Sequence, residues 1–293
     1  SRLASEQKVI VITINYRLGP FGWFYHPSLI ETANSKEDKS GNYGLLDQIL
    51  ALKWVKKNIK EFGGNPDNVT IFGESAGGHN VFSLISSNLA SNLFHRAISQ
   101  SGSTRTTSIE DASNYLDDEI NPGWPTSSKE IVNNLLVGHS DAKDAYEAKI
   151  LQDSMNNSNL KDFLQSLSSS EIFDTYEEKI VAGMFNVPRI IADGYVLPKE
   201  GMKFRRGQFN KVPTMLGTNR DEMKLFFALD EEFVTSFANF IIFVKDEEKY
   251  EIENEYASNN WKISGVDQPA RKLTKSGNPD VFAYRFDWDE EPT

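Results

Sequence analysis

A serine flanked by glycines is the clearest chemical signal in this chain. The segment FGESAGGH, residues 72–79, fits the pattern G-x-S-x-G with Gly73, Ser75 and Gly77. A serine hydroxyl becomes a good nucleophile only when a base removes its proton. The preceding VTIF reads as a short buried strand, and a helical pattern follows. In that context the glycines allow a sharp turn that exposes the Ser75 hydroxyl, while Ala76 supplies a backbone N–H to a developing oxyanion. The alternative is an ordinary glycine-rich turn between a strand and a helix.

A nucleophilic serine of this kind also needs a carboxylate that orients the base. When the serine lies in a G-x-S-x-G turn between strand and helix, the chain order is serine, then Asp or Glu, then histidine. The segment MLGTNRDE places Asp221 and Glu222 directly after a predicted strand, so one of them is the expected acid. The alternative for either carboxylate is a surface charge, which is the common case in an acidic chain.

The base must be a histidine, and the sequence offers four candidates, none of which follows Glu222. His79 lies one helical turn after Ser75, and the turn directs the serine away from that helix, so we expect His79 to pack or hydrogen-bond locally. The other three occur in a loop beside a proline, at the start of a strand and in a polar insertion: His26, His95 and His139. None is a convincing base.

The elements around these residues alternate between strand and helix in one direction, which is typical of a parallel sheet with crossover helices. Residues 104–187 interrupt the alternation with a polar, mostly helical segment that we interpret as an insertion, with predicted helices such as SKEIVNNLLVG and NLKDFLQSLSS. Helical patterns are also predicted at residues 43–59, after Ser75, at 221–229 and at 231–243. Strands are predicted at residues 8–18, 69–73, 95–102, 211–219 and 280–288.

Composition excludes several classes of protein. The 293 residues carry a net charge of −11, which argues against nucleic-acid binding because a phosphate backbone needs a basic face. There is no cysteine, and therefore no disulfide and no cysteine–zinc site. The longest apolar run, residues 237–244, is too short to span a bilayer. No metal or organic cofactor is expected, since no cluster of His and Asp residues has ligand spacing.

Several longer segments resemble the type-B carboxylesterase family, the cholinesterase-like branch of the α/β-hydrolases. They are NYRLGPFGW, GNYGLLDQILALKWVKKNIKEFGGNPDNVTIFGESAGG, LFHRAISQSGS, ADGYVLP and VPTMLGTNRDE. The resemblance implies an α/β-hydrolase fold and runs over residues 8–222 and 281–288. It describes residues 1–293 as one partial domain with the insertion at about 104–187.

The resemblance also implies roles for individual residues. Ser75 would be the nucleophile, Glu222 the triad acid and Glu74 a buried acid beside the serine. Arg17 and Asp47 would form a structural ion pair that joins a strand to a helix. The remaining implied positions support the site: Ser101 and the Asp193–Gly194 turn.

The chain departs from the family pattern at three places. Nothing before VIVITINYR matches the glycine-rich oxyanion loop, and no His-Gly motif follows VFAYRF. The family's commoner Asp-Glu-Gly reads Asp-Glu-Met here. We therefore expect an internal fragment of a larger esterase, with the histidine and the oxyanion loop outside it; the alternative is a complete protein that lost both ends.

The resulting hypothesis is a serine carboxylic-ester hydrolase that acts on a small-molecule ester through an acyl-enzyme. A non-catalytic adhesion or partner-binding protein is the alternative, because the family includes members that lost the nucleophile, and a lipase is a third possibility. Localisation, oligomeric state and acyl or alcohol preference stay open.

The missing oxyanion-loop strand leads to an expectation about the sheet. In the α/β-hydrolase strand order it would lie between the strands predicted at Val9–Ile14 and Val69–Phe72. These two strands should therefore stand about 9 to 10 Å apart, or have closed up as neighbours at about 4.8 Å. A gap would expose unpaired backbone and an apolar face, and the isolated chain should then aggregate.

Overall fold

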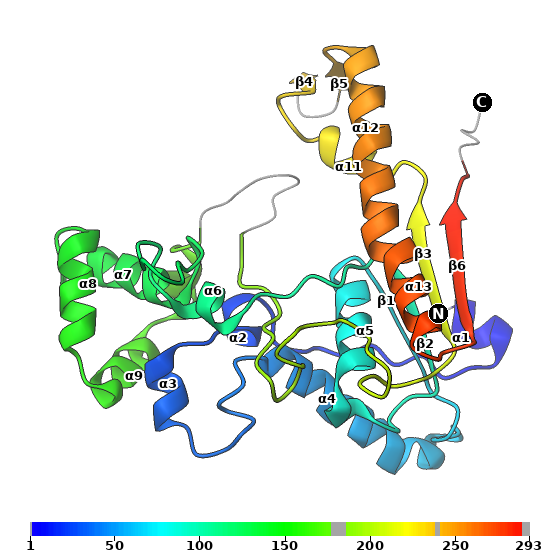
Figure 1. The fold of residues 1–293 in the computed structure, drawn as a ribbon, viewed down its shortest axis with the longest axis horizontal. Coiled ribbons are helices and arrows are strands. Elements are labelled where there is room, and N and C mark those ends of the chain that lie inside the picture. The colour runs from blue at the N-terminus through cyan, green and yellow to red at the C-terminus, as the bar shows by residue number, and fades with distance from the viewer. Residues whose placement is uncertain (1, 177–185, 238–240, 289–293) are drawn as a thin grey trace. The chain divides into compact units, whose positions relative to one another are not determined.

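The computed structural model describes residues 2–176, 186–237 and 241–288 (Figure 1). Residues 177–185 of the expected insertion and 238–240 of the longest apolar run lie outside the described part. The chain divides into two compact units. The first comprises Ser1–Pro66, Arg105–Glu177 and Phe185–Gly201, and the second Asp67–Thr104, Glu178–Met184 and Met202–Thr293.

The second unit is built on a parallel sheet of four described strands in the order β1-β2-β3-β6. Four of the predicted strands are confirmed, each with slightly shorter bounds: β1 (Thr70–Glu74), β2 (Arg96–Gln100), β3 (Thr214–Asn219) and β6 (Val281–Phe286). The strands are parallel because each connection crosses over through helical segments, as the alternating pattern predicted.

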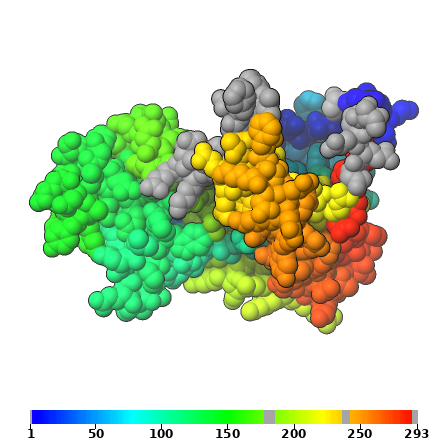
Figure 2. Space-filling view, turned by 90° about the horizontal axis from the view of Figure 1, so that it is seen from above, coloured from blue at the N-terminus to red at the C-terminus, as the bar shows by residue number. Residues whose placement is uncertain are grey.

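Helices of the second unit pack against this sheet. Among them, α5 (Ala76–Ser86) packs against β1 and β2 (Figure 1). The segment η3 (Ile263–Asp267) packs against β3, and α13 (Gln268–Lys275) packs against β6. In the space-filling view of Figure 2, α12 (Glu247–Lys262, orange) lies on the outside of the unit. The other helical segments of this unit are η2 (Asn88–Ala90) and α11 (Lys224–Phe227).

The helix predicted over residues 231–243 is wrong. The structure has a two-stranded antiparallel hairpin there, formed by β4 (Val234–Phe237) and β5 (Ile241–Val244). Its sequence is rich in Val, Thr, Phe and Ile, which fit a pleated strand better than a helix. The hairpin is anchored at its base, where Phe233 stacks on Phe227 with ring centroids 4.3 Å apart and both rings contact Tyr250.

The strand predicted over residues 8–18 is also wrong. Residues 9–18 have no strand or helical assignment until α2 begins at Gly19, and apolar side chains expected to be buried are exposed, with Val9 and Ile10 each 46% exposed. A strand exists only where a second strand completes its hydrogen bonds, and none of the described strands pairs with this segment. Among the described strands β1 pairs only with β2, so β1 forms one edge of the described sheet. The expected spacing between Val9–Ile14 and Val69–Phe72 joins the two units and stays a prediction.

The first unit is helical in its described part. The expected helix over residues 43–59 is α4 (Tyr43–Asn58), whose periodic apolar residues Leu45, Ile49 and Leu52 are buried. SKEIVNNLLVG forms α7 (Ser128–Gly138), where the Ser127 side chain caps the helix by accepting a hydrogen bond from Glu130 N. The remaining helices are α1 (Arg2–Gln7), α2 (Gly19–Gly22), α3 (Pro27–Thr32), η1 (Ile59–Phe62), α6 (Ile109–Ser113), α8 (Ala145–Ser154), α9 (Asn157–Ser166) and α10 (Ser169–Phe173).

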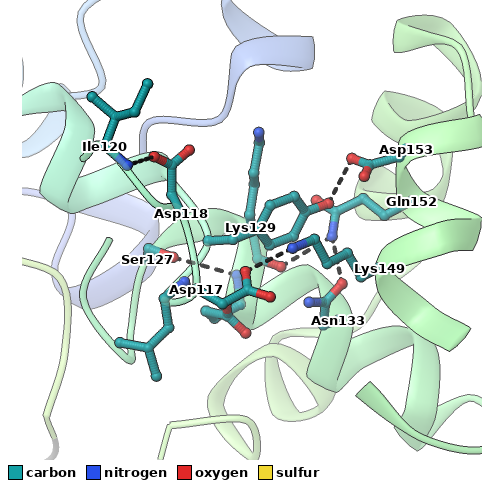
Figure 3. Close-up of polar contacts among 12 residues, drawn as sticks. Asp117, Asp118, Ile120, Ser127, Lys129, Asn133, Lys149, Gln152 and Asp153 are labelled. Atoms are coloured by element: carbon teal, nitrogen blue, oxygen red, sulfur yellow. Dashed lines mark hydrogen bonds and ion pairs between the residues drawn. The ribbon is translucent and has the colours of Figure 1, made fainter. Parts of the chain in front are cut away.

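Polar contacts attach the segment after α6 to the helices that follow it. Tyr115 donates a 2.8 Å hydrogen bond to Asp153 of α8. Lys149 pairs with Asp117 at 2.6 Å (Figure 3). The ammonium groups of Lys129 and Lys149 lie 4.6 and 4.4 Å from the Tyr115 ring centroid. These contacts fix the loop that connects α6 to α7.

Candidate functional site

Ser75 lies at the turn between β1 and α5, as the G-x-S-x-G pattern predicted. Its backbone has φ 52° and ψ −115°, which is strained for a residue with a side chain. A Cβ added to Gly73 would lie 2.5 Å from the backbone of Gly77, so the turn needs glycine at position 73. Ser75 N donates a 2.9 Å hydrogen bond to Gln100 O, which holds the strained residue against β2.

Ala76 is the first residue of α5 and is exposed. The first N–H groups of a helix have no partner within that helix, and they lie at the positive end of its dipole. The Ala76 N–H therefore lies beside Ser75 at the positive end of α5.

The two candidate acids have different surroundings. Glu222 is buried, and its Oε2 accepts hydrogen bonds from Thr218 Oγ1 (2.7 Å), Asn219 N (2.7 Å) and Ser101 Oγ (3.0 Å). Asp221 instead accepts hydrogen bonds from Arg220 Nε at 2.8 Å and Asn254 Nδ2 at 3.0 Å. Glu222 is thus the carboxylate that is directed toward the ends of the strands.

Ser101 connects Glu222 to the sheet. It follows β2 directly and has a φ of 50°, which is again unusual for a residue other than glycine. Its N–H donates to Gly217 O at 2.7 Å, and its carbonyl accepts from Trp261 Nε1 at 3.2 Å. With its hydroxyl bonded to Glu222, Ser101 is held at three points.

The register of the sheet brings these residues to one edge. Glu74 pairs with Gln100, and Gln100 pairs with Gly217. The next residues along the three strands, Ser75, Ser101 and Thr218, therefore follow at the same level. This is the carboxyl edge of a parallel sheet, where open α/β folds place their ligands.

Glu74 does not match its expectation. The residue is exposed, although the family resemblance implied a buried acid. It ends β1, which has no partner strand on its outer side in the described sheet, so no described strand covers it there.

The ion pair that the resemblance implied is present in the first unit. Arg17 Nη2 and Nε each lie 2.8 Å from an oxygen of Asp47, and Arg17 N donates to the same carboxylate at 2.9 Å. The hydrogen bonds from Arg17 are the main cause of the lowered pKa of Asp47. The pair joins an unassigned segment, rather than a strand, to α4.

The Asp193–Gly194 turn is also formed. Asp193 accepts hydrogen bonds from the backbone N–H groups of Val196 and Leu197, and Gly194 has a φ of 83°.

Each of the four histidines has a hydrogen-bond partner other than the Ser75 hydroxyl. His79 Nδ1 lies 2.7 Å from the backbone carbonyl of Ser75, so the local hydrogen bond expected for it is confirmed. The other three contact partners within their own units: His26 with Gln152 and Ser28, His95 with Val69 N, and His139 with Glu171.

Two further findings concern the described residues alone. No three His, Asp or Glu side chains among them are grouped so that they could hold a metal ion. No helix among them is long and apolar enough to cross a bilayer.

A parallel sheet with crossover helices and a strained serine between strand and helix is the architecture of the α/β-hydrolases, and the solved structures below share this fold. The model of the carboxylesterase family matches residues 1–291, so the chain belongs to the carboxylesterase family.

Its curated relatives are esterases. The chain is 36% identical over 233 residues to para-nitrobenzyl esterase of Bacillus subtilis (strain 168). This match covers 79% of this chain and 41% of that protein. It is 37% identical over 224 residues to carboxylesterase 1D of Rattus norvegicus, and this match covers 75% of this chain and 35% of that protein. The chain thus spans roughly two fifths or less of these relatives' length.

Solved structures agree with this assignment. A PNB esterase superposes with a TM-score of 0.67 at 29% identity, and the match covers 100% of this chain and 58% of that chain. The carboxylesterase EST55 of Geobacillus stearothermophilus gives a TM-score of 0.69 at 25% identity with the same coverage.

Sequence reasoning missed the residues around Glu222. Glu222 itself is contacted by Thr218. Three residues of α12 contact Asp221, Met223 and Ser101 around it: Asn254, Ser258 and Trp261. The only available signal was the helical spacing of the three α12 residues.

Proposed function

We propose that this chain carries the nucleophile and the acid of a serine carboxylic-ester hydrolase. The observation that carries the proposal is the arrangement at one sheet edge, where Ser75 occupies a strained turn and Glu222 is buried against Ser101. Membership of the carboxylesterase family supports the same reaction class.

In the proposed mechanism, Ser75 Oγ attacks the ester carbonyl while a histidine takes its proton. The Ala76 N–H stabilises the oxyanion, and collapse of the tetrahedral intermediate releases the alcohol and leaves an acyl-enzyme. Water activated by the same histidine then hydrolyses the acyl-enzyme and releases the carboxylic acid product. Glu222 orients that histidine and stabilises its positive charge.

The base in this proposal comes from outside the 293 residues. The engagement of all four histidines with other groups supports this. We further propose that residues 1–293 belong to one α/β-hydrolase domain with an insertion near residues 104–187, since the family model extends over residues 1–291.

The proposed substrates are small-molecule carboxylic esters. The name of the Bacillus subtilis relative makes para-nitrobenzyl esters a first choice for assays, beside short-chain p-nitrophenyl esters. The non-catalytic adhesion alternative is not favoured, because the relatives found are esterases.

Replacement of the nucleophile tests the proposal. In the natural polypeptide that contains these 293 residues, Ser75→Ala should lower kcat for p-nitrophenyl acetate by several orders of magnitude, because loss of a triad serine costs about 10⁶-fold. Ser166→Ala, which changes a hydroxyl bonded only within its own helix α9, is the matched control and should leave the rate unchanged.

Two outcomes would contradict the proposal. Near-normal turnover by the Ser75→Ala variant would exclude Ser75 as the nucleophile. If the 293 residues alone reacted with a fluorophosphonate at Ser75 as fast as the natural polypeptide, the base would lie within them.

A further inference from the structure

One face of α12 carries polar residues at helical spacing. Asn254, Ser258 and Trp261 follow one another at intervals of four and three residues, which places them on the same side of the helix. Asn254 is 1% and Ser258 2% exposed, although the helix as a whole is strongly polar. We call these three residues the polar stripe. Figure 1 shows α12 running beside β3, the strand that leads to Glu222.

Each member of the polar stripe contacts a residue next to the proposed site. Asn254 Nδ2 donates to Asp221 Oδ1 at 3.0 Å, and Ser258 Oγ accepts from Met223 N at 3.0 Å. Ser258 Oγ also donates to Asn254 Oδ1 at 3.0 Å. The amide of Asn254 is therefore fixed with its NH₂ group toward Asp221.

These contacts hold the chain on both sides of Glu222. The side chain of Asp221 is bound by the stripe and by Arg220, and the backbone of Met223 is bound by Ser258. The intervening carboxylate is left to face Ser101 and Thr218. The stripe thereby selects which of two adjacent carboxylates reaches the sheet edge.

The third contact acts on Ser101. Trp261 donates to its carbonyl at 3.2 Å, and the indole ring stacks on Phe226 with centroids 5.9 Å apart. One turn further, a Cβ added to Gly265 would lie 2.4 Å from Gly102 O, so η3 approaches the turn after Ser101 very closely.

We propose that the polar stripe of α12 positions the acid of the triad: Asn254 and Ser258 fix the chain around Glu222, and Trp261 fixes Ser101, which hydrogen-bonds to Glu222. The proposal rests on the proposed function, in which Glu222 is the triad acid. Buried polar groups whose hydrogen bonds are all satisfied make one geometry rigid, which is what an acid that orients a base requires.

The first test uses Ser258→Ala in the natural polypeptide, with p-nitrophenyl acetate as substrate. The kcat should fall by about tenfold to 100-fold, because small displacements of catalytic groups have effects up to this size. KM should stay within about twofold, since no substrate contact is removed. Ser258→Thr keeps the hydroxyl and should restore most of the rate.

Two further variants complete the series. Trp261→Phe keeps an aromatic ring against Phe226 but loses the N–H, and it should show the same loss of kcat at unchanged KM. Asn259→Ala changes an exposed asparagine of the same helix and is the matched control, with wild-type kinetics expected. Equal losses in Asn259→Ala and Ser258→Ala would overturn the proposal.

A double-mutant cycle separates positioning from general stability. If the stripe acts through Glu222, adding Ser258→Ala to Glu222→Gln should cause no further loss of kcat. Losses that multiply would show that the stripe does not act through this carboxylate, and would overturn the proposal.

Hydrogen exchange distinguishes failure of the stripe from failure of the proposed function. The amides of residues 218–223 should exchange faster in Ser258→Ala than in the wild type or Asn259→Ala. If Ser75→Ala leaves hydrolysis intact, the proposed function is wrong, and faster exchange would still support positioning of this segment by the stripe. Unchanged exchange in Ser258→Ala would overturn the stripe whatever the kinetics show.

Discussion

Two of the four non-glycine residues with positive φ in the described part of the second unit belong to the proposed site; the other two are Asn92 and Phe204. Ser75 and Ser101 both have φ near 50°, directly after neighbouring parallel strands. Such conformations persist only where the surroundings determine them. Here each serine donates its backbone N–H to the next strand, at Gln100 and Gly217 respectively. The sheet therefore fixes the backbone of both serines before any substrate binds.

A single buried histidine in the first unit should make stability depend on pH. His26 Nδ1 accepts from Ser28 N at the start of α3, and Nε2 lies 3.1 Å from Gln152 Oε1. Gln152 itself donates to Asn133, as Figure 3 shows. Burial is the main cause that lowers the pKa of His26 to about 4, and the charge of Lys129 adds to it. A protonated ring would lose its Nδ1 acceptor.

The sign of the effect follows from the direction of this shift. The unfolded chain binds a proton at the ordinary pKa of about 6.5, whereas the folded chain resists protonation down to about 4. The contribution of neutral His26 to the free energy of unfolding is fully present above pH 6.5, and it is lost as the pH falls toward 4. The loss is on the order of 3 kcal/mol.

Urea unfolding of wild type and His26→Asn between pH 7.5 and 4 should show this difference. Asparagine still caps α3 but does not titrate, so the variant should lose less stability on acidification. His139→Asn changes a partly exposed histidine and serves as the control. Parallel curves for wild type and His26→Asn would contradict the assignment of a neutral buried ring.

At the scale of elements, the site depends on how closely α5 approaches β2. A Cβ added to Gly78 would lie 2.7 Å from Gln100 O and 2.9 Å from Gly102 Cα, while nothing lies within 4 Å of one added to Gly77. The helix α5 therefore packs closely on the sheet at Gly78 and not at Gly77.

These two adjacent glycines provide a matched pair of variants for stability. Gly78→Ala should lower the free energy of unfolding by about 1–3 kcal/mol, because α5 must move away from backbone atoms. Gly77→Ala should be neutral or raise it by up to about 1 kcal/mol, because alanine favours a helix. Chemical denaturation measures both, and equal effects would contradict the close approach seen at Gly78.

At the scale of the whole molecule, one face of the sheet stands out. A row of paired residues crosses all four strands: Phe72, Ile98, Met215 and Phe282. Three of them are exposed: Phe72 by 55%, Met215 by 41% and Phe282 by 57%. Parallel sheets are normally covered on both faces, so this row is an apolar surface of the kind that drives association.

We expect the isolated 293-residue chain to associate through this row. Phe282→Lys should lower the sedimentation coefficient at high protein concentration toward that of the monomer. Tyr256→Lys adds the same charge at another exposed aromatic residue, on α12, and should have little effect. If both variants reduced association equally, added charge rather than the sheet face would be responsible.

The sequence by itself determined the elements whose signals are local. The turn at Ser75 follows from glycines that fit a close approach, and α4 and α7 follow from apolar periodicity. Chain order narrowed the acid to Asp221 or Glu222, and the family resemblance pointed to Glu222. The turn and the two helices depend on residues that are close together in the chain, whereas the acid depended on chain order and on the family resemblance.

Only the tertiary structure decided the features that depend on distant partners. Residues 8–18 have the composition of a strand, but no described strand pairs with them. Residues 231–243 read as a helix until β4 and β5 complete each other's hydrogen bonds. The polar stripe was visible only as spacing, because Asn254 and Ser258 acquire a role when α12 packs beside the chain around Glu222. A hydrogen bond needs both its donor and its acceptor, and a local pattern specifies only one of them.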